Sequence, residues 1–152
     1  MEIINKFEGE YEFLSNFAYS PFEVNGVTYQ TNEHFFQATK AINPEDQKTI
    51  ALADTPGKAK RYGRKIALRS DWEIIKEDVM RCGLAAKFRQ NPELMRKLID
   101  TGDAILIEGT SWHDNYWGNC YCDKCANIQG KNRLGELLME LRTAERKYYY
   151  DK

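Results

Sequence analysis

The sequence lacks an excess of charge of one sign, and it lacks any long apolar run. Its 22 lysine and arginine residues nearly balance its 23 aspartate and glutamate residues, which gives a net charge of −1. This balance argues against an evenly basic surface for nucleic acid but leaves a local basic patch open. Because no run of eighteen apolar residues occurs, the sequence predicts no helix that spans a membrane.

The sequence begins without the basic start and apolar stretch of a secretory signal. We therefore expect a cytoplasmic protein whose four cysteines are reduced. No repeat, linker or low-complexity tract interrupts the chain. A chain of about 150 residues buries roughly 70% of its extended surface and needs no disulfide to fold, so we predict a single domain over residues 1–152.

Short strands near the start and helices afterwards are the predicted elements. Asn25-Gly26 lies between two short segments that contain valine, and this dipeptide favours a tight hairpin. Four dipeptides are typical helix starts: Thr31-Asn32, Asn43-Pro44, Thr55-Pro56 and Asn91-Pro92. Ser70 and Glu73 have the spacing of a capping box at the start of a long helix. Its predicted apolar positions are Ile74, Ile75, Val79, Met80, Leu84 and Phe88.

The second half of the chain adds a buried strand and a final helix. Residues 104–108 have the composition of a buried strand. Four leucines at helical spacing mark the last helix: Leu134, Leu137, Leu138 and Leu141. The predicted fold class is therefore α+β, a helix-dominated domain with a small antiparallel sheet from the N-terminal segments and residues 104–108.

The helix that begins at Glu33 carries three polar groups on one stripe. At 100° per residue, Glu33, Gln37 and Lys40 lie within about 60° of one another. The stripe is either an ordinary solvated face or a catalytic site. A carboxylate can act as a general acid or base, and a lysine can attack a sugar carbonyl. His34 points away from this stripe, and we interpret it either as a packing residue or as a residue that supports the site without touching substrate.

A basic segment and a tryptophan follow. Residues 57–69 contain lysines and arginines but no carboxylate. The segment is either a solvated strip or a phosphate clamp in which Arg64 and Lys65 take part. Trp72 and Lys76 are one helical turn apart, so the indole can stack on a base while Lys76 holds phosphate. The alternative for Trp72 is a place in the core.

Three cysteines lie within six residues, at positions 120, 122 and 125. Cys120, Cys122 and Cys125 can bind zinc if a fourth ligand folds in, and His113 or Cys82 can supply it. The spacing is irregular for a zinc finger, and free buried thiols are the alternative interpretation.

Residues 130–135 open the last helix with a glycine at each end. Helix N-terminal amides beside Lys131 and Arg133 would suit an anion, and we count Asn132 and Arg133 as candidate substrate-binding residues. The alternative is that the two glycines serve only close packing.

Several segments, taken in order, resemble the NADAR family, also called the YbiA-like N-glycosidases. They are residues 13–17, 32–40, 71–73, 86–88, 116–118 and 130–135. The resemblance covers nearly the whole chain and implies a YbiA-like domain that cleaves an N-glycosidic bond. The implied substrates are riboflavin-pathway intermediates or ADP-ribosylated guanine. One departure is that Cys120, Cys122 and Cys125 replace a glycine-rich stretch.

The resemblance places residues of the family's motif at Glu33, Lys40, Trp72, Asp114 and Trp117, and our hypothesis gives roles to these and to neighbouring residues. Glu33 would be the acid, base or electrostatic stabiliser, Lys40 would hold the ribose or form a Schiff base, and Asp114 would position a hydroxyl or water. Trp72 and Trp117 would wall the base pocket, and Asn16 with Phe17 would close it. The phosphate candidates are Arg64, Lys65, Lys76 and Arg133.

The expected partner is a small ribosyl or ADP-ribosyl molecule or an ADP-ribosylated nucleic acid. We expect no obligate protein partner and no required cofactor, with zinc as a candidate at the cysteine loop. Two other functions stay open. One is a module that binds ADP-ribose or NAD without cleaving it, and the other is a zinc-containing adaptor.

Overall fold

The computed structural model describes residues 2–150. Their contacts divide the chain into two compact units. One unit contains Asn16–Pro92, and the other contains Met1–Ser15 together with Glu93–Lys152. The single domain over residues 1–152 stays a prediction.

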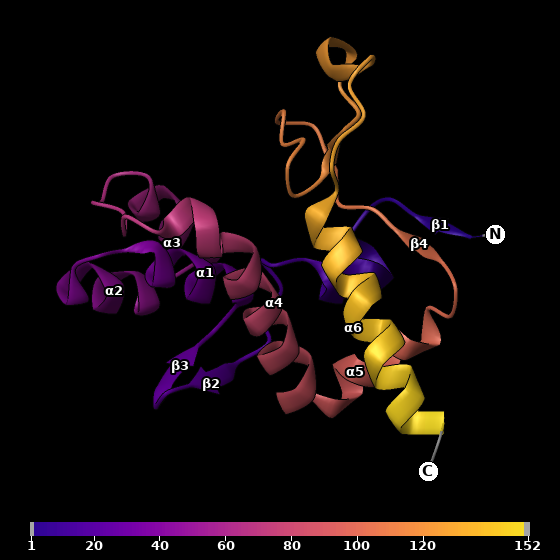
Figure 1. The fold of residues 1–152 in the computed structure, drawn as a ribbon, viewed down its shortest axis with the longest axis horizontal. Coiled ribbons are helices and arrows are strands. Elements are labelled where there is room, and N and C mark those ends of the chain that lie inside the picture. The colour runs from indigo at the N-terminus through magenta and orange to yellow at the C-terminus, as the bar shows by residue number, and fades with distance from the viewer. Residues whose placement is uncertain (1, 151–152) are drawn as a thin grey trace. The chain divides into compact units, whose positions relative to one another are not determined.

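The unit of residues 16–92 consists of a hairpin followed by four helices (Figure 1). Its elements are β2 (Phe22–Val24), β3 (Val27–Tyr29), α1 (Asn32–Lys40), α2 (Pro44–Ala51), α3 (Pro56–Gly63) and α4 (Trp72–Gln90). The hairpin prediction is confirmed, because β2 and β3 pair antiparallel. Both turn residues have positive φ, 51° at Asn25 and 83° at Gly26, as a primed turn requires. Helix α1 packs against α2, α3 and α4.

The predicted starts of α1, α2 and α3 are confirmed by their caps. The side chains of Thr31, Asn43 and Thr55 each accept a backbone N–H two or three residues further on. Such caps satisfy amides that the helix itself leaves without a partner. One isoleucine and three alanines then fill the space between these helices: Ala38, Ala41, Ile50 and Ala59.

The predicted start and buried face of α4 need correction. The helix begins at Trp72 with Asp71 as its N-cap residue, so Ser70 and Glu73 do not form a capping box. The Asp71 carboxylate instead accepts two hydrogen bonds from Arg69, at 3.0 and 3.2 Å. Ile74 is 83% exposed, because it lies about 120° around the helix from the buried Met80.

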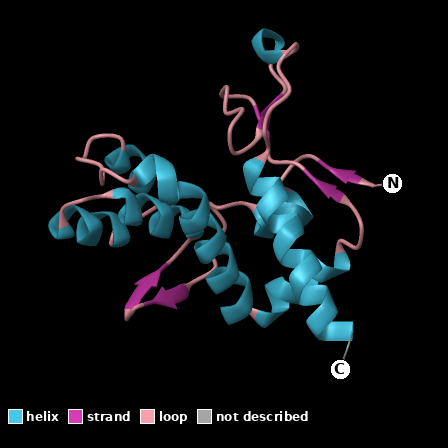
Figure 2. Cartoon of the chain, in the orientation of Figure 1, coloured by secondary structure: helices cyan, strands magenta, loops and turns pink. Residues whose placement is uncertain are grey.

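The other unit contains short strands, two 3₁₀ turns and two helices (Figure 2). They are β1 (Ile3–Ile4), η1 (Gly9–Leu14), α5 (Pro92–Asp100), β4 (Ile105–Leu106), β5 (Gly109–Thr110), β6 (Asn119–Cys120), η2 (Asp123–Cys125) and α6 (Arg133–Tyr150). The four leucines predicted to line α6 are all buried. None of the described helices combines the length and apolar character needed to cross a membrane.

The α+β class is confirmed, but the predicted sheet is only partly right. Within residues 2–150 the strands form three separate two-stranded pairs. Residues 105–106 do not join the antiparallel hairpin, because β4 pairs with β1 in parallel. Strands of two residues carry too little alternation for the sequence to indicate a pairing direction.

Candidate functional site

The polar stripe of α1 is buried rather than solvated. Every residue from Thr31 to Ala38 is buried, and Glu33 is only 6% exposed. Nε2 of Gln37 donates a hydrogen bond to Oε1 of Glu33 at 2.8 Å. A solvated face is therefore the wrong interpretation for Glu33 and Gln37. Burying a carboxylate is costly unless it has partners, so this placement is typical of a functional group.

The first turn of α1 is held by a network that sequence reasoning did not detect. The Glu33 amide donates to the backbone oxygen of Asn16 at 3.0 Å. Nδ2 of Asn32 donates to Oδ1 of Asn16 at 2.9 Å. Gly83 of α4 lets α1 approach, because a Cβ there would overlap Oδ1 of Asn32. Asn16 therefore positions Glu33, while its predicted contact with substrate stays a prediction.

Lys40 lies at the other end of the stripe and is partly buried. Burial lowers the pKa of its ammonium group, and the neighbouring cations Arg64 and Lys60 lower it further, while Glu33 acts in the opposite direction. The C-terminal end of α1 is fixed to the segment before α4. The Arg69 amide donates to the Lys40 carbonyl at 3.0 Å.

Gly63 is a second supporting residue that the sequence did not reveal. A Cβ at this position would overlap Oε1 of Gln37 and lie 3.0 Å from Cε of Lys40. Because Gly63 has no side chain, the side chains of Gln37 and Lys40 can occupy this space. In the sequence Gly63 is one of ten glycines, and a glycine near the end of a helix is common for reasons of conformation alone.

The aromatic and basic candidates of this unit differ in their environments. Trp72 is buried and packs edge-on against Phe36, with ring centroids 4.9 Å apart. This contact places it in the core, and its role as a wall of the base pocket stays a prediction. Phe17 is 43% exposed, and the Lys60 ammonium lies 5.8 Å from its ring centroid.

The basic candidates lie on the surface or in ion pairs. Arg64 and Lys65 are exposed. Lys76 forms an ion pair with Glu73 at 2.6 Å, so a phosphate would compete with that carboxylate. Phosphate contact by these three residues stays a prediction.

His34 is a packing residue, one of the two interpretations from the sequence. Its Nδ1 lies 2.8 Å from the Thr31 hydroxyl, and its Nε2 lies 2.9 Å from the Ala53 carbonyl oxygen. A carbonyl can only accept, so the hydrogen is on Nε2. The imidazole ring thus connects the start of α1 with the segment that follows α2.

Asp114 and Trp117 belong to the unit that contains Glu93–Lys152. Oδ1 of Asp114 accepts the backbone N–H groups of Tyr116 and Trp117, at 3.0 and 2.9 Å. This is an Asx-type turn, in which the carboxylate shapes its own loop. The predicted contacts of Asp114 and Trp117 with substrate stay predictions.

The start of α6 differs from the predicted anion site. Four consecutive amides, at residues 131–134, donate to backbone carbonyls of residues 115–118. Asn132 is also occupied: Nδ2 donates to the Leu106 carbonyl, and Oδ1 accepts the Glu108 amide. These hydrogen bonds attach the loop of residues 115–118 and the end of β4 to the start of α6. The amides are therefore already occupied, and the prediction that they bind an anion is wrong. The structure gives Asn132 a structural role.

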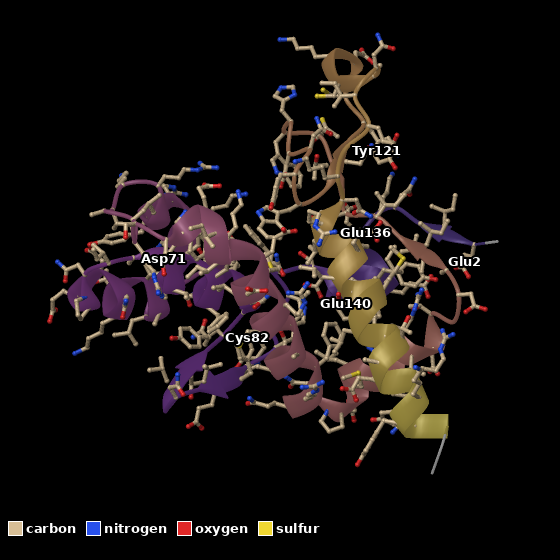
Figure 3. The ribbon with its side chains drawn as sticks, in the orientation of Figure 1. Glu2, Asp71, Cys82, Tyr121, Glu136 and Glu140 are labelled. Atoms are coloured by element: carbon tan, nitrogen blue, oxygen red, sulfur yellow. The ribbon has the colours of Figure 1, made fainter. Side chains whose placement is uncertain are left out.

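Arg133 lies in an acidic setting. It lines a surface hollow of about 270 Å³ together with Glu136 and Glu140 of the same helix. Figure 3 labels both carboxylates on α6. Two carboxylates in the hollow oppose a phosphate there, and phosphate binding by Arg133 stays a prediction.

The cysteine loop brings its predicted metal ligands together. One ligand atom from each of His113, Cys120, Cys122 and Cys125 lies within 4.8 Å of the other three. Cys82 is not one of the four and is exposed on α4 (Figure 3).

Comparisons with known proteins agree with the fold. The NADAR domain profile matches residues 4–145. The chain belongs to the NADAR family.

Two curated relatives and one solved structure are similar to this chain. It is 45% identical over 135 residues to N-glycosidase YbiA of Shigella boydii, a match that covers 88% of this chain and 81% of the relative. It is 34% identical over 137 residues to N-glycosidase Npun_R5314 of Nostoc punctiforme, covering 87% and 84%. The NMR structure of the Escherichia coli protein YbiA matches with a TM-score of 0.86 and 40% identity, covering 100% of this chain and 90% of that one.

Proposed function

We propose that this chain is an N-glycosidase that hydrolyses the C–N bond between a ribose or ribose phosphate and a base-like leaving group. The observation that carries the proposal is the buried stripe of α1, which places a carboxylate and an amine with a lowered pKa on one helix face. Relatives that carry the name N-glycosidase match over most of their length, which supports the same reaction.

Glu33 is proposed to stabilise the positive charge that develops on the sugar during the reaction, or to activate water. Cleavage of the C–N bond builds positive charge at the anomeric carbon, and a nearby carboxylate stabilises that charge or activates water. The Gln37 amide fixes the Glu33 carboxylate from one side. Glu33 also lies in the first turn of α1, where the helix dipole favours a negative charge.

Lys40 is proposed to act on the sugar as a nucleophile or as a ligand. As a nucleophile, its neutral amine attacks the anomeric carbon, the C–N bond breaks, and the base leaves with a proton. The sugar ring then opens at its C1–O4′ bond, and the remaining proton of the Lys40 nitrogen moves to O4′, which leaves an imine between Lys40 and C1. Water adds to this imine and releases the sugar aldehyde and the free amine. A lowered pKa raises the fraction of neutral amine at neutral pH, which favours this route over a purely electrostatic role.

The proposed substrate carries a ribose and at least one phosphate. The exposed cations Arg64 and Lys65 lie on the segment that follows Gly63, and arginine forks suit phosphate oxygens. Phosphorylated intermediates of riboflavin synthesis and ADP-ribose attached to guanine both meet this description. We expect the hydrolysis itself to use water and these side chains without an organic cofactor.

A panel of ribosylated substrates tests the proposal. The purified chain is incubated with phosphorylated ribosyl pyrimidines, NAD and ADP-ribosylated DNA, and products are followed by mass spectrometry. Release of a free base and a ribose phosphate or ADP-ribose is expected from at least one of them. Tight binding by calorimetry with every ligand left intact would instead identify a binding module.

Borohydride trapping tests the role of Lys40. With substrate present, reduction should leave a sugar adduct on Lys40 in the wild type and none in Lys40→Met. Lys58→Met is the matched control, because Lys58 is exposed and paired with Asp54 at 3.2 Å. Full turnover by Lys40→Met without any adduct would eliminate the imine route.

A further inference from the structure

The loop between β5 and the start of α6 has very little apolar core. We call residues 111–130 the cysteine arm. All twenty are described, and only Gly118, Cys120 and Cys125 are buried. Two of these three are cysteines, so the hydrophobic effect has little to act on here. A segment of this kind is usually held by a disulfide or a metal, and its cysteines are free thiols in this structure.

The distances in the cysteine arm are those of a metal site. Nδ1 of His113 lies 3.4 Å from Sγ of Cys125 and 3.4 Å from Sγ of Cys122. Zinc bonds of about 2.3 Å to sulfur and 2.0 Å to nitrogen place neighbouring ligand atoms about 3.5–3.8 Å apart in a tetrahedron. The full set lies within 4.8 Å, so only a small contraction is needed.

The backbone delivers each ligand separately. His113 has a φ of 69°, an uncommon conformation for a residue other than glycine, and its ring faces the thiols of Cys122 and Cys125. The 3₁₀ turn η2 places Cys122 and Cys125 one turn apart, with the Cys125 amide bonded to the Cys122 carbonyl at 3.1 Å. Cys120 comes from β6, which pairs with β5.

A neighbouring amide supports the cluster in the way that outer groups support metal ligands. Nδ2 of Asn115 lies 3.4 Å from Sγ of Cys125, and its Oδ1 accepts the Cys120 amide at 2.9 Å. The Asn115 carbonyl accepts the Lys131 amide just before α6. Hydrogen bonds of this kind orient metal ligands and stabilise thiolate charge.

We propose that His113, Cys120, Cys122 and Cys125 bind one zinc ion that fixes the cysteine arm. Three sulfur ligands and one imidazole suit zinc, and four protein ligands leave no open position for water, so the site is structural. On binding, the three thiols give up their protons to solvent as the metal–sulfur bonds form. The ion would hold the turn that contains Asp114 and Trp117, whether or not the chain cleaves glycosides.

Metal analysis of the full chain, purified without a metal-affinity step and under reducing conditions, tests this proposal. We expect close to one zinc per chain in the wild type and in Cys82→Ser, whose cysteine lies outside the cluster. Cys122→Ser and Cys125→Ser should lose the zinc, while His113→Cys should keep it because four ligands remain. Asn115→Ala should weaken zinc binding by roughly 10- to 100-fold.

Cobalt substitution of the wild type covers the case in which the cysteine variants fail to fold. One equivalent of cobalt should give the intense visible bands of tetrahedral thiolate coordination, and zinc should abolish them. Wild-type protein that holds no zinc and gives no such bands would overturn the proposal. So would a disulfide within the cysteine arm in protein alkylated at cell lysis, or iron with acid-labile sulfide in place of zinc.

Discussion

Helix α1 and the cysteine arm both concentrate polar side chains, but they are held in opposite ways. In α1, Glu33, His34 and Gln37 are surrounded by a packed apolar unit, and each has a hydrogen-bond partner. The cysteine arm has almost no apolar packing and depends on backbone hydrogen bonds and, in our proposal, on a zinc ion. Apolar packing and hydrogen bonds can therefore hold a buried carboxylate in place without a metal, whereas a polar loop needs another source of rigidity.

The largest effect on turnover is expected from a substitution of the buried carboxylate, Glu33. Glu33→Gln keeps the size of the side chain and leaves an oxygen that can still accept from Gln37, but it removes the charge. We expect turnover on the substrate found in the panel to fall by roughly 10²- to 10⁴-fold. The melting temperature should change little, because the hydrogen bond survives.

Glu45→Gln is the matched control for this experiment. Glu45 also lies in the first turn of a helix, α2, but its side chain is exposed. It should keep wild-type turnover. Undiminished turnover in Glu33→Gln would remove Glu33 from the mechanism and leave the buried stripe as a purely structural feature.

The second prediction is that removal of metal affects the cysteine arm but not α1. If zinc fixes the cysteine arm as we propose, removing it with a chelator should speed hydrogen exchange there on the order of 100-fold or more, because the ion would replace the missing apolar packing. The amides of Tyr116 and Trp117, which the Asp114 carboxylate accepts, are the most informative. Amides of α1 should keep their exchange rates. Equal acceleration in both regions would contradict the comparison.

The sequence predicted the first region better than the second, for a physical reason. Helix starts at Thr31, Asn43 and Thr55 depend on side chains close in sequence, so they could be predicted and are confirmed. The burial of Glu33 depends on Asn16 and Gly83, which are distant in sequence, and no local pattern indicates this.

The candidate site shows the same limit. The spacing of Glu33, Gln37 and Lys40 predicted a shared stripe but left its burial open, and the role of Gly63 depends on the packing of α3 on α1. At the start of α6, the sequence left open whether the N-terminal amides bind an anion or the two glycines serve only close packing. The carbonyls of residues 115–118 accept them instead, a result of loop geometry that composition does not encode.

A smaller effect is expected where α3 packs against the stripe. In Gly63→Ala the new methyl group would overlap Oε1 of Gln37 and press on Lys40. Overpacking of this kind typically costs 1–3 kcal/mol, and we expect about that loss of unfolding free energy by chemical denaturation. Turnover should also fall, because Gln37 can no longer orient Glu33.

Gly57→Ala in the same helix is the control. There a Cβ would meet only Oγ1 of Thr55 at 3.9 Å, an ordinary contact. Alanine is a better helix former than glycine, so this variant should be as stable as the wild type or slightly more stable. If Gly63→Ala behaves like Gly57→Ala, the stripe is less tightly packed than the structure indicates.

The smallest effect concerns the charge around Lys40. If the neutral amine is the nucleophile, kcat should rise with pH until it passes the pKa of Lys40 and then level off. Arg64 lowers that pKa, so Arg64→Gln should raise it and shift the rising limb to higher pH. Since Arg64 is exposed and screened by salt, the shift should stay below about one pH unit. Measuring kcat at saturating substrate separates this effect from any loss of phosphate binding.

Lys58→Gln should leave the limb in place, because Asp54 already pairs with Lys58. A limb that stays fixed in Arg64→Gln, or that persists in Lys40→Met, would assign the titration to another group and restrict Lys40 to binding the sugar.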